Sequence, residues 1–409
     1  MVSILSQREL LVKDVVYYIC MHYIFLLLVW GASLTLAAFP PSPPSSVPPI
    51  PANLLDDEYI GGPSQEPNIV QSLSDAELLE YKKASKEKCL NILIGSEERG
   101  FYYNGEPLDV GEKNPWGLKA MQARVAGDRL AYIWRDRGRD YVVVDDVMVD
   151  TLSKVDSPNS QPQLKLNQKH VAFIQLVAMS PRPFRSTFHL IFDGKDMGQI
   201  DLLDYKLNGD HVIYDVVEDR TLTKSSVFID GKKKVKGSNG DYDGKNFGYG
   251  EVGSNGKLIY NGKKLGYGGD LTLKDGHRAY ILGRTENAIN PKVYYDGKVV
   301  GPGRRPVIEK NHLAYARSPM DVDKKSTDER WRLVYDGREQ GIIGGYDYNV
   351  SLAGDHFAYV RFLDQSAHPF KDKDAPGVIT IDGTDYPGTF AQGMVYVEIT
   401  EKTDKSVCE

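Results

Sequence analysis

Arginine recurs at one position of a repeated pattern, near the end of a short segment that carries an aromatic residue. The set chosen for this position and the adjoining loops, with one neighbouring tryptophan, is Trp134, Arg135, Arg182, Arg185, Arg284, Arg317 and Arg361. A guanidinium group offers a planar, two-pronged contact to a carboxylate or a phosphate. These side chains therefore predict a binding face for an acidic protein segment or an anionic glycan. The alternative is that they pair with carboxylates of the same loops, namely Asp136, Asp140, Glu218, Asp219 and Asp364.

Five of the eight histidines share another position of the repeat, three residues before its aromatic residue: His170, His211, His277, His312 and His356. A group of histidines can indicate a metal site, because imidazole is a common metal ligand. Each of these histidines, however, belongs to a different repeat unit, so we expect them to be spread around the fold. We therefore expect each imidazole, at the hairpin of strands A and B, to hydrogen-bond a neighbouring turn, and we expect no metal.

Two further segments match ligand-binding motifs only in part. Residues 248–253 have the glycine spacing of a dinucleotide-binding loop, but another hairpin follows where that loop requires a helix. The acidic segment around Asp321 and Asp323 lacks the glycine of a calcium loop. No Gly-x-Ser-x-Gly, His-Glu-x-x-His or P-loop motif occurs in the sequence. We therefore assign no catalytic residue and expect no nucleotide or other cofactor.

Two short motifs alternate along the chain after residue 97. The first is a two-residue turn typical of tight β-hairpins, at Asn104-Gly105, Asp193-Gly194, Asp230-Gly231, Asn261-Gly262, Asp296-Gly297, Asp336-Gly337 and Asp382-Gly383, with Asp145-Asp146 as a degenerate copy. The second is a polar turn followed by a strand with an aromatic residue, which ends at Tyr132, Phe173, Tyr214, Tyr249, Tyr280, Tyr315, Tyr359 and Tyr396. Each motif occurs eight times.

This alternation indicates an all-β fold made of one repeated unit. The unit averages about 40 residues with about four short strands, A to D, which is typical of a β-propeller blade. The series opens with a lone C–D hairpin at 101–110 and closes with a lone A–B hairpin at about 389–400. Together these complete one blade, so we predict an eight-bladed β-propeller closed by strands from both termini. A seven-bladed propeller with extra strands is the alternative, because 91–95 could serve as strand B of the first hairpin.

The blade motif resembles that of a known group of propellers. The segments DGHRAY at 275–280 and GDHFAY at 354–359 are similar to the repeats of TolB-type, WD-repeat-like bacterial propellers, and the pattern is also similar to the propeller domain of dipeptidyl-peptidase-type proteins. The resemblance covers about residues 97–400 and implies a propeller fold. Such propellers serve as binding platforms, lyases, hydrolase covers and assembly scaffolds. The chain lacks the Trp-Asp ending and most Ser-Pro-Asp-Gly turns, so no particular partner is carried over.

The N-terminal segment predicts one transmembrane helix. Residues 15–39 carry no formal charge and are long enough, at about 1.5 Å per residue, to span a bilayer. Arg8 and Lys13 precede the segment, and the next basic residue is Lys82, so we expect the N-terminus inside and the rest of the chain outside. The alternative is a cleaved signal peptide, because residues 36–38 loosely resemble a cleavage site, and the protein would then be secreted.

The remaining chain divides by composition. We predict these regions: 1–39 as a membrane anchor or signal segment, 40–72 as a Pro-rich linker, 73–96 as a short helix and lead-in, 97–401 as the propeller, and 402–409 as a C-terminal tail. Ser74 and Glu77 form a capping box that predicts a helix from Asp75 to Lys88. The net charge of −6 argues against a nucleic-acid partner, which would favour a basic surface.

Cys89 and Cys408 flank the propeller and are the only cysteines outside the membrane segment. Closing the ring brings these two ends together, so we expect a disulfide if their Cα atoms lie within about 7 Å. The sequence as a whole predicts a membrane-anchored, extracytoplasmic binding or assembly module for a protein or an anionic glycan. The alternative function is an enzyme of lyase or glycosidase type with carboxylates in the central mouth.

Overall fold

The computed structural model describes residues 73–408 apart from 97–99, 109–121, 137–138, 153–162, 182–183, 201–204, 218–224, 252–255, 284–290, 323–329, 344–349, 364–376 and 391–394. The anchor and the Pro-rich linker predicted for residues 1–72 lie outside this part. None of the helices within it combines the length and hydrophobicity of a membrane span.

The described chain is almost entirely antiparallel β-sheet. The first sheets contain β31 (Val395–Glu401), β1 (Leu90–Ser96), β2 (Gly100–Tyr103) and β3 (Glu106–Pro107); β4 (Ala123–Ala126), β5 (Arg129–Asp136), β6 (Arg139–Val144) and β7 (Val147–Leu152); β8 (Leu164–Leu166), β9 (Val171–Pro181), β10 (Phe184–Phe192) and β11 (Lys195–Ile200); and β12 (Tyr205–Asn208), β13 (His211–Val217), β14 (Ser225–Ile229) and β15 (Lys232–Lys236).

The remaining sheets include one that is longer than the others. They contain β16 (Ser238–Tyr242), β17 (Phe247–Glu251), β18 (Lys257–Tyr260), β19 (Lys263–Lys274), β20 (His277–Leu282), β21 (Lys292–Tyr295) and β22 (Lys298–Pro302); β23 (Arg304–Glu309), β24 (His312–Arg317), β25 (Arg332–Tyr335) and β26 (Arg338–Ile342); and β27 (Val350–Ala353), β28 (His356–Phe362), β29 (Gly377–Ile381) and β30 (Thr384–Phe390). In the seven-stranded sheet, β19 pairs with both β18 and β20.

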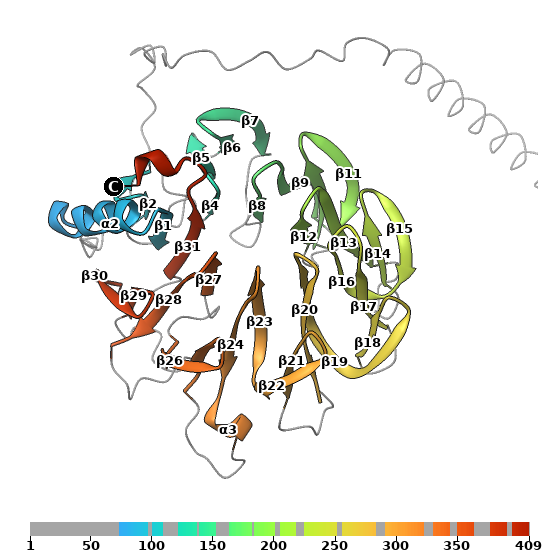
Figure 1. Cartoon of the computed structure of the whole chain (residues 1–409). Coiled ribbons are helices and arrows are strands. Elements are labelled where there is room, and N and C mark those ends of the chain that lie inside the picture. The colour runs from blue at the N-terminus through green and yellow to red at the C-terminus, as the bar shows by residue number, and fades with distance from the viewer. Residues whose placement is uncertain are drawn as a thin grey trace, which may run out of the picture. The chain divides into compact units, whose positions relative to one another are not determined.

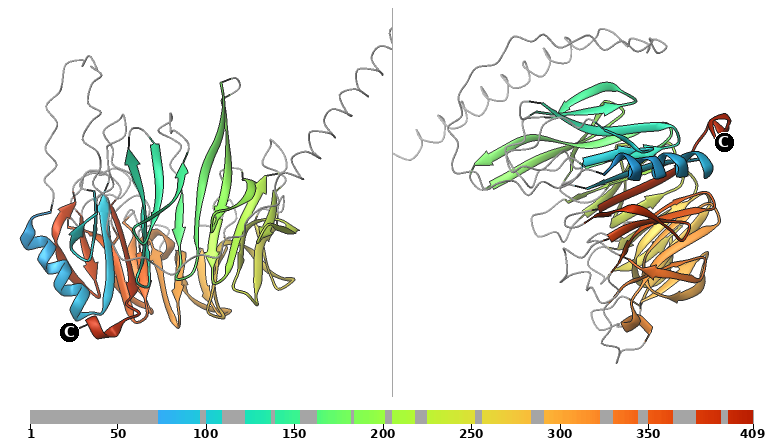
Figure 2. Two further views of the ribbon diagram at one scale, coloured as in Figure 1. Left: turned by 90° about the horizontal axis from the view of Figure 1, so that it is seen from above. Right: turned by 90° about the vertical axis from the view of Figure 1, so that its left-hand side faces the viewer.

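The sheets follow one another around a common axis and form a closed ring. Eight strands, which we call the innermost strands, contact one another in the order β4, β8, β12, β16, β19, β23, β27 and β31, and β31 contacts β4 again. Of these neighbours, β16 and β19 belong to the same sheet, and the others belong to different sheets. Figure 1 looks along this axis, and Figure 2 shows the same sheets from two other sides. A closed ring of radial antiparallel sheets is a β-propeller.

The eight two-residue turns that the sequence predicts are confirmed as left-handed turns between the third and fourth strands. Both turn residues have positive φ, for example 46° at Asp336 and 79° at Gly337. The degenerate copy also adopts this conformation, with φ of 50° at Asp145 and 62° at Asp146. Aspartate and asparagine tolerate positive φ better than other residues with a side chain, which explains why they hold this position.

The closing sheet differs from the prediction. Only one strand, β31, comes from the C-terminus, and it pairs along its full length with β1, from Leu90 opposite Glu401 to Ser96 opposite Val395. The expected A–B hairpin at 389–400 is therefore wrong, and residues 90–96 of the expected lead-in belong to the sheet. The reason is that strands A and B of this sheet lie at opposite ends of the chain, so the polar turn that marks strand B elsewhere is missing.

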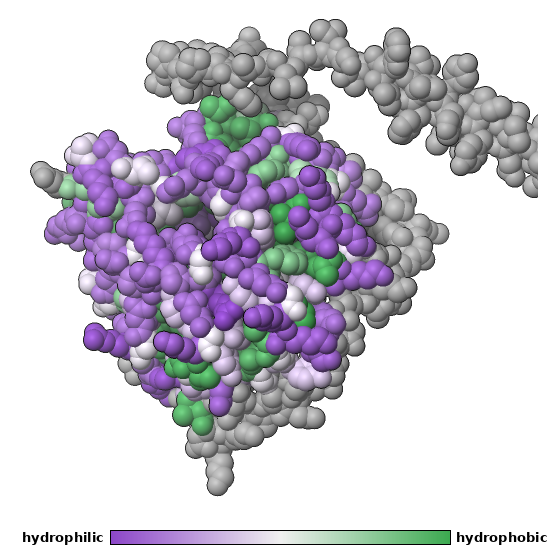
Figure 3. Space-filling view, turned by 45° about the vertical axis from the view of Figure 1, so that its right-hand side comes forward, coloured by the Kyte–Doolittle hydropathy of each residue, from purple (hydrophilic) through white to green (hydrophobic). Residues whose placement is uncertain are grey.

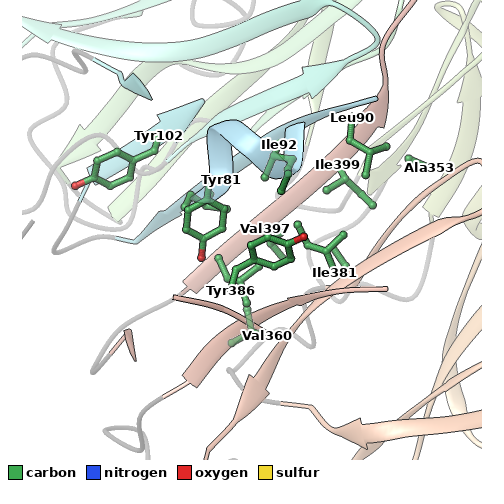
Figure 4. Close-up of a cluster of buried hydrophobic side chains, with 14 of the residues drawn as sticks. Tyr81, Leu90, Ile92, Tyr102, Ala353, Val360, Ile381, Tyr386, Val397 and Ile399 are labelled. Carbon is green, nitrogen blue, oxygen red and sulfur yellow. The ribbon is translucent and has the colours of Figure 1, made fainter. Parts of the chain in front are cut away.

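Helix α2 (Asp75–Glu87) covers the outside of the closing sheet. It begins at the N-cap Ser74, and both hydrogen bonds of the predicted capping box with Glu77 are present. Figure 4 shows Tyr81 of α2 in the cluster of buried side chains that contains Ile92 of β1 and Val397 of β31. Burial of a side chain of this size stabilises the fold by about 1.5–3 kcal/mol. The cluster therefore joins both ends of the described chain.

The glycine-rich segment at 248–253 has a structural role where it is described. Gly248 and Gly250 lie in β17, which is a strand of the ring. A Cβ atom at Gly248 would collide with the side chain of Leu271 in the inner strand β19. Glycine at this position therefore allows the backbone of β17 to lie close to the Leu271 side chain of β19.

Candidate binding pockets

The histidines of the repeat fix the C–D turns. In each of five sheets, an imidazole Nδ1 contacts Oδ2 of the turn aspartate, and Oδ1 accepts the backbone N–H of the residue after the histidine at 2.9–3.0 Å. The pairs are His170–Asp193, His211–Asp230, His277–Asp296, His312–Asp336 and His356–Asp382, at 2.5, 2.7, 2.7, 2.6 and 2.8 Å. The expected hydrogen bond to a turn is confirmed, and the turn is the C–D turn of the same sheet.

The other three turns keep the same contact with different residues. Asn104 and Asn261 each donate to an asparagine in the histidine position, Asn91 and Asn246, at 3.0 Å. The aspartate of the degenerate turn, Asp145, receives Arg129 at 3.0 Å instead. A charged turn residue is thus matched by a cation or an imidazole, and a neutral one by an amide. This matching supports a structural role for the histidines.

His312 offers a test of the contact between the repeat histidine and the turn aspartate, because it contacts two carboxylates. Asp336 lies 2.6 Å from its Nδ1 and Asp355 lies 3.0 Å from its Nε2, and the hydrogen bond to Asp336 is the main cause that raises its pKa above the ordinary value of 6.5. A raised pKa means that charged His312 stabilises the fold below about pH 6.5, and that this contribution is lost as the pH rises through the folded-state pKa. We expect His312→Asn to cost more free energy of unfolding at about pH 5.5 than at about pH 8.5, as measured by denaturant titration. An equal cost at both pH values would contradict this role.

A large pocket lies on the axis of the ring. It has a volume of about 820 Å³, and all eight innermost strands or the turns that follow them contribute to its wall. Its charged lining residues are Lys165, Lys169, Asp210, Lys206, Asp241, Asp243, Lys274, Asp275, Glu309, Lys310, Glu398 and Glu401. Because the lining residues lie at the ends of the A strands, this pocket faces the A–B turns. The arginines selected from the sequence, such as Arg317 and Arg361, lie instead near the other ends of the B strands.

Lysines and carboxylates of this pocket form ion pairs between sheets. Lys169 contacts Asp210 at 2.8 Å, Lys206 contacts Asp241 at 3.1 Å, and Lys310 contacts Glu401 at 2.7 Å. Lys274 and Glu309 form a further pair. Each pair joins residues from different sheets, so these charges compensate one another around the pocket.

Glu398 of the closing strand is fixed in the wall of the same pocket. It accepts the backbone N–H of Val125 at 3.0 Å and the hydroxyl of Tyr396 at 2.6 Å. The guanidinium of Arg124 lies 4.7 Å from the Tyr396 ring. Burial raises the pKa of Glu398, and the nearby Arg124 partly offsets this effect. The bond to Val125 connects β31 to β4, so Glu398 links the closing sheet to its neighbour.

A second, smaller pocket lies between the last two sheets of the series. Its volume is about 350 Å³. We call it the arginine pocket, and its lining residues are Arg330, Arg332, Gln340, Gly341, Ile342, Tyr359, Arg361, Phe362, Thr380, Gly383 and Asp385. Among the described residues of this lining, three arginines and one aspartate sum to a formal charge of +2. This local charge is opposite in sign to the net charge of the whole chain, −6.

Two arginines that the sequence analysis selected contact carboxylates here. Arg361 lines the pocket, whereas Arg317 lies beside it and shares Glu339 with the lining residue Arg332. Arg361 makes a two-pronged contact with Asp385, with Nε 3.0 Å from Oδ1, and this contact lowers the pKa of Asp385. Arg317 contacts Glu339, which also receives Arg332 at 2.5 Å. Burial acts to raise the pKa of Glu339, but the hydrogen bonds from both arginines lower it overall. The carboxylate partners lie on the outer strands β26 and β30, not in the loops that the sequence analysis named.

The structure does not bring the other selected residues into this pocket. Trp134 is half-buried in β5, and its ring lies 5.4 Å from that of Tyr141. Arg135 and Arg185 belong to β5 and β10 of other sheets. Arg182 and Arg284 lie outside the described residues. The sequence analysis missed Arg330 and Arg332, which precede and begin strand C of their sheet rather than end strand B.

The ends of the described chain are joined covalently. Cys89, directly before β1, forms a disulfide with Cys408, and their Cα atoms are 5.0 Å apart. This distance meets the geometric requirement stated above. Figure 2 shows α2 and the C-terminal end side by side in both views. Cys408 directly follows the short helix at Lys405–Val407, so the disulfide attaches this C-terminal helix to the closing sheet.

Comparison with known proteins gives only distant similarities. No family model and no curated protein sequence matches the chain. Acylaminoacyl peptidase of Pyrococcus horikoshii is 12% identical, with a TM-score of 0.39, over 78% of this chain and 62% of that chain. The β-propeller domain of the Trilobed protease from Pyrococcus furiosus is 13% identical, with a TM-score of 0.35, over 61% and 85%. AztD from Citrobacter koseri is 8% identical, with a TM-score of 0.34, over 76% and 97%. Our conclusions therefore rest on the sheets and pockets of this chain.

Proposed function

We propose that this protein is an extracytoplasmic binding module for an anionic partner. In this proposal, residues 15–39 anchor the chain in a membrane with its N-terminus inside, or are removed so that the protein is secreted. The uncharged segment after Arg8 and Lys13 supports export. The disulfide between Cys89 and Cys408 fits an oxidising compartment. The similarity of the repeats to TolB-type propellers supports a role as a binding platform.

We further propose that the ring has eight blades. Three features support this number. Eight innermost strands line the axial pocket, and eight left-handed C–D turns repeat the same hydrogen-bonded contact. The long strand β19 pairs with β18 through residues 263–267 and with β20 through residues 268–274, so it serves as the outer strand of one blade and the inner strand of the next.

The net positive charge of the arginine pocket is the observation that carries the proposed function. Among the described residues, Arg330, Arg332 and Arg361 line a space of about 350 Å³ together with one carboxylate, that of Asp385. Including the adjacent pair of Arg317 and Glu339 leaves the net charge at +2. Arginine is the residue best suited to bind carboxylates and phosphates. The face drawn in Figure 3 is mostly hydrophilic, which fits a polar ligand better than an apolar one.

The alternative function, an enzyme with carboxylates in the central mouth, would require an acid–base pair on the axis. Carboxylates do line the axial pocket, but the contacts of several of them are structural. Asp241 is held by Lys206, Glu401 by Lys310, and Glu398 by backbone and tyrosine hydrogen bonds. This engagement favours the binding function over the enzymatic one.

Retention on immobilised polyanions tests the proposed function. We expect the full-length chain, in a buffer with non-ionic detergent, to bind polygalacturonate or poly-glutamate but not neutral dextran, and to elute as the salt concentration rises. Replacing both Arg317 and Arg361 by alanine should weaken retention about tenfold, because about 1.4 kcal/mol of charge-assisted contact is lost.

The matched control is Arg338→Ala, which removes an exposed arginine of β26 that does not line the pocket. This variant should be retained like the wild type. Equal loss in both variants would indicate a general charge effect, and retention on dextran or on neither polyanion would contradict the proposed function. Circular dichroism of each variant should first show that the sheet content is unchanged.

A further inference from the structure

One lining residue of the arginine pocket is a glycine, Gly341. At Gly341 of β26, a Cβ atom would lie 2.9 Å from the Tyr359 hydroxyl and 3.3 Å from Cδ of Arg361. Any larger residue at this position would displace Tyr359 or Arg361, and both of these side chains line the pocket. The pocket therefore depends on Gly341, and its volume of about 350 Å³ lies in the range of small-ligand sites.

The wall of the pocket combines cationic groups with hydrogen-bond acceptors. Arg361 spends two of its five N–H groups on Asp385 and can offer the others to a ligand. Asp385 accepts the buried Thr380 hydroxyl at 2.7 Å and is itself 40% exposed, so its oxygens can also accept hydrogen bonds from a ligand. Gln340 adds an amide to the same lining.

This mixture discriminates between anions. A sulfate dianion satisfies arginines, but it has no hydroxyl group to donate to Asp385. The hydrogen phosphate dianion has a single hydroxyl group, and Asp385 repels both dianions more strongly than it repels a ligand with one negative charge. A sugar acid carries one carboxylate for the arginines and several hydroxyl groups for Asp385 and Gln340. Neutral sugars lack the carboxylate that the arginines of the pocket would bind.

We propose that the arginine pocket binds a uronic acid residue of an acidic glycan. The carboxylate lies against Arg361 and Arg332, and the ring hydroxyls donate to Asp385. This inference rests on the proposed function and names the ligand of the same site. It differs from that function in excluding acidic peptides and simple phosphates as the preferred ligands.

Titration of the full-length chain with small probes tests the inference. The probes are D-glucuronate, D-glucose, inorganic phosphate and a tetra-glutamate peptide, with binding followed by isothermal titration calorimetry. We expect D-glucuronate to bind at least about tenfold more tightly than each of the others, and Arg361→Gln to remove this preference. Tighter binding of glucose, phosphate or the peptide, or no binding of glucuronate, would overturn the inference.

Two variants of the pocket and one control test whether the lining residues recognise D-glucuronate. Asp385→Asn keeps the size of the side chain but removes its charge, so affinity for D-glucuronate should fall while affinity for phosphate should rise. Gly341→Val should abolish glucuronate binding by displacing Tyr359 and Arg361, which line the pocket. Arg338→Gln is the matched control and should bind like the wild type. If poly-glutamate is retained in the earlier assay but glucuronate does not bind here, the inference fails while the proposed function stands.

Discussion

Cys408→Ser is expected to lower the free energy of unfolding by up to about 5 kcal/mol, because the disulfide closes a loop of about 320 residues in the chain-entropy model. Native contacts of β31 with β1 remain in the variant, so the loss acts mainly through the unfolded chain. Cys89→Ser and the double variant should show the same loss, since each removes the same bond. Denaturant titration with and without a reducing agent measures it.

The chain contains its own control for this experiment. Cys20 is the third and last cysteine, and Cys20→Ser should leave the stability unchanged and still respond to reduction. The three other variants should not respond to the reducing agent. Identical unfolding midpoints for the oxidised and reduced wild type would contradict the predicted contribution of the disulfide.

Local signals in the sequence predicted much of the fold. An Asp-Gly or Asn-Gly pair needs no distant partner to favour a left-handed turn, so all eight turns could be found from the residues alone. The structural role of the histidines could be predicted from the same periodicity. Residues at the same position of five different repeats are spread around a ring and cannot converge on one site. The capping box of Ser74 and Glu77 could also be predicted, because it depends only on residues that are three positions apart.

Features that depend on distant pairing could not be read in this way. Strand β1 carries no polar turn before it, because its partner β31 lies about 300 residues away in the chain. The ion pairs of the axial pocket join sheets that are neighbours only once the ring is closed. Lys206 and Asp241, for example, belong to successive innermost strands, β12 and β16.

Part of the arginine pocket could be predicted from the sequence. Arg317 and Arg361 each lie five residues after a repeat histidine, and their partners Glu339 and Asp385 each lie three residues after the turn aspartate. This repeated arginine–carboxylate pairing in two consecutive units is the signal that could have identified the partners. Which pair faces a hollow depends on Gly341 and on the spacing of two sheets, which the sequence alone does not define.

Lys206→Met is expected to lower the free energy of unfolding by about 3 kcal/mol, because it leaves a buried carboxylate without its cation. Asp241 is only 3% exposed, and its Oδ2 lies 3.1 Å from the Lys206 Nζ. The same oxygen accepts the backbone N–H of Leu273 at 3.0 Å, so Asp241 also connects β16 to β19. Denaturant titration of the variant measures the loss.

A second ion pair of the same pocket provides the matched control. Lys169 and Asp210 are 68% and 59% exposed, so water solvates both charges, and Lys169→Met should cost no more than about 0.5 kcal/mol. Adding Asp241→Asn to Lys206→Met should restore part of the stability, because the amide keeps an acceptor for Leu273 without a buried charge. Equal losses for Lys206→Met and Lys169→Met would show that burial of Asp241 does not determine the cost. The exposed pair of Lys169 and Asp210 would then contribute as much to stability as the buried pair, and solvation of its charges would not determine that contribution.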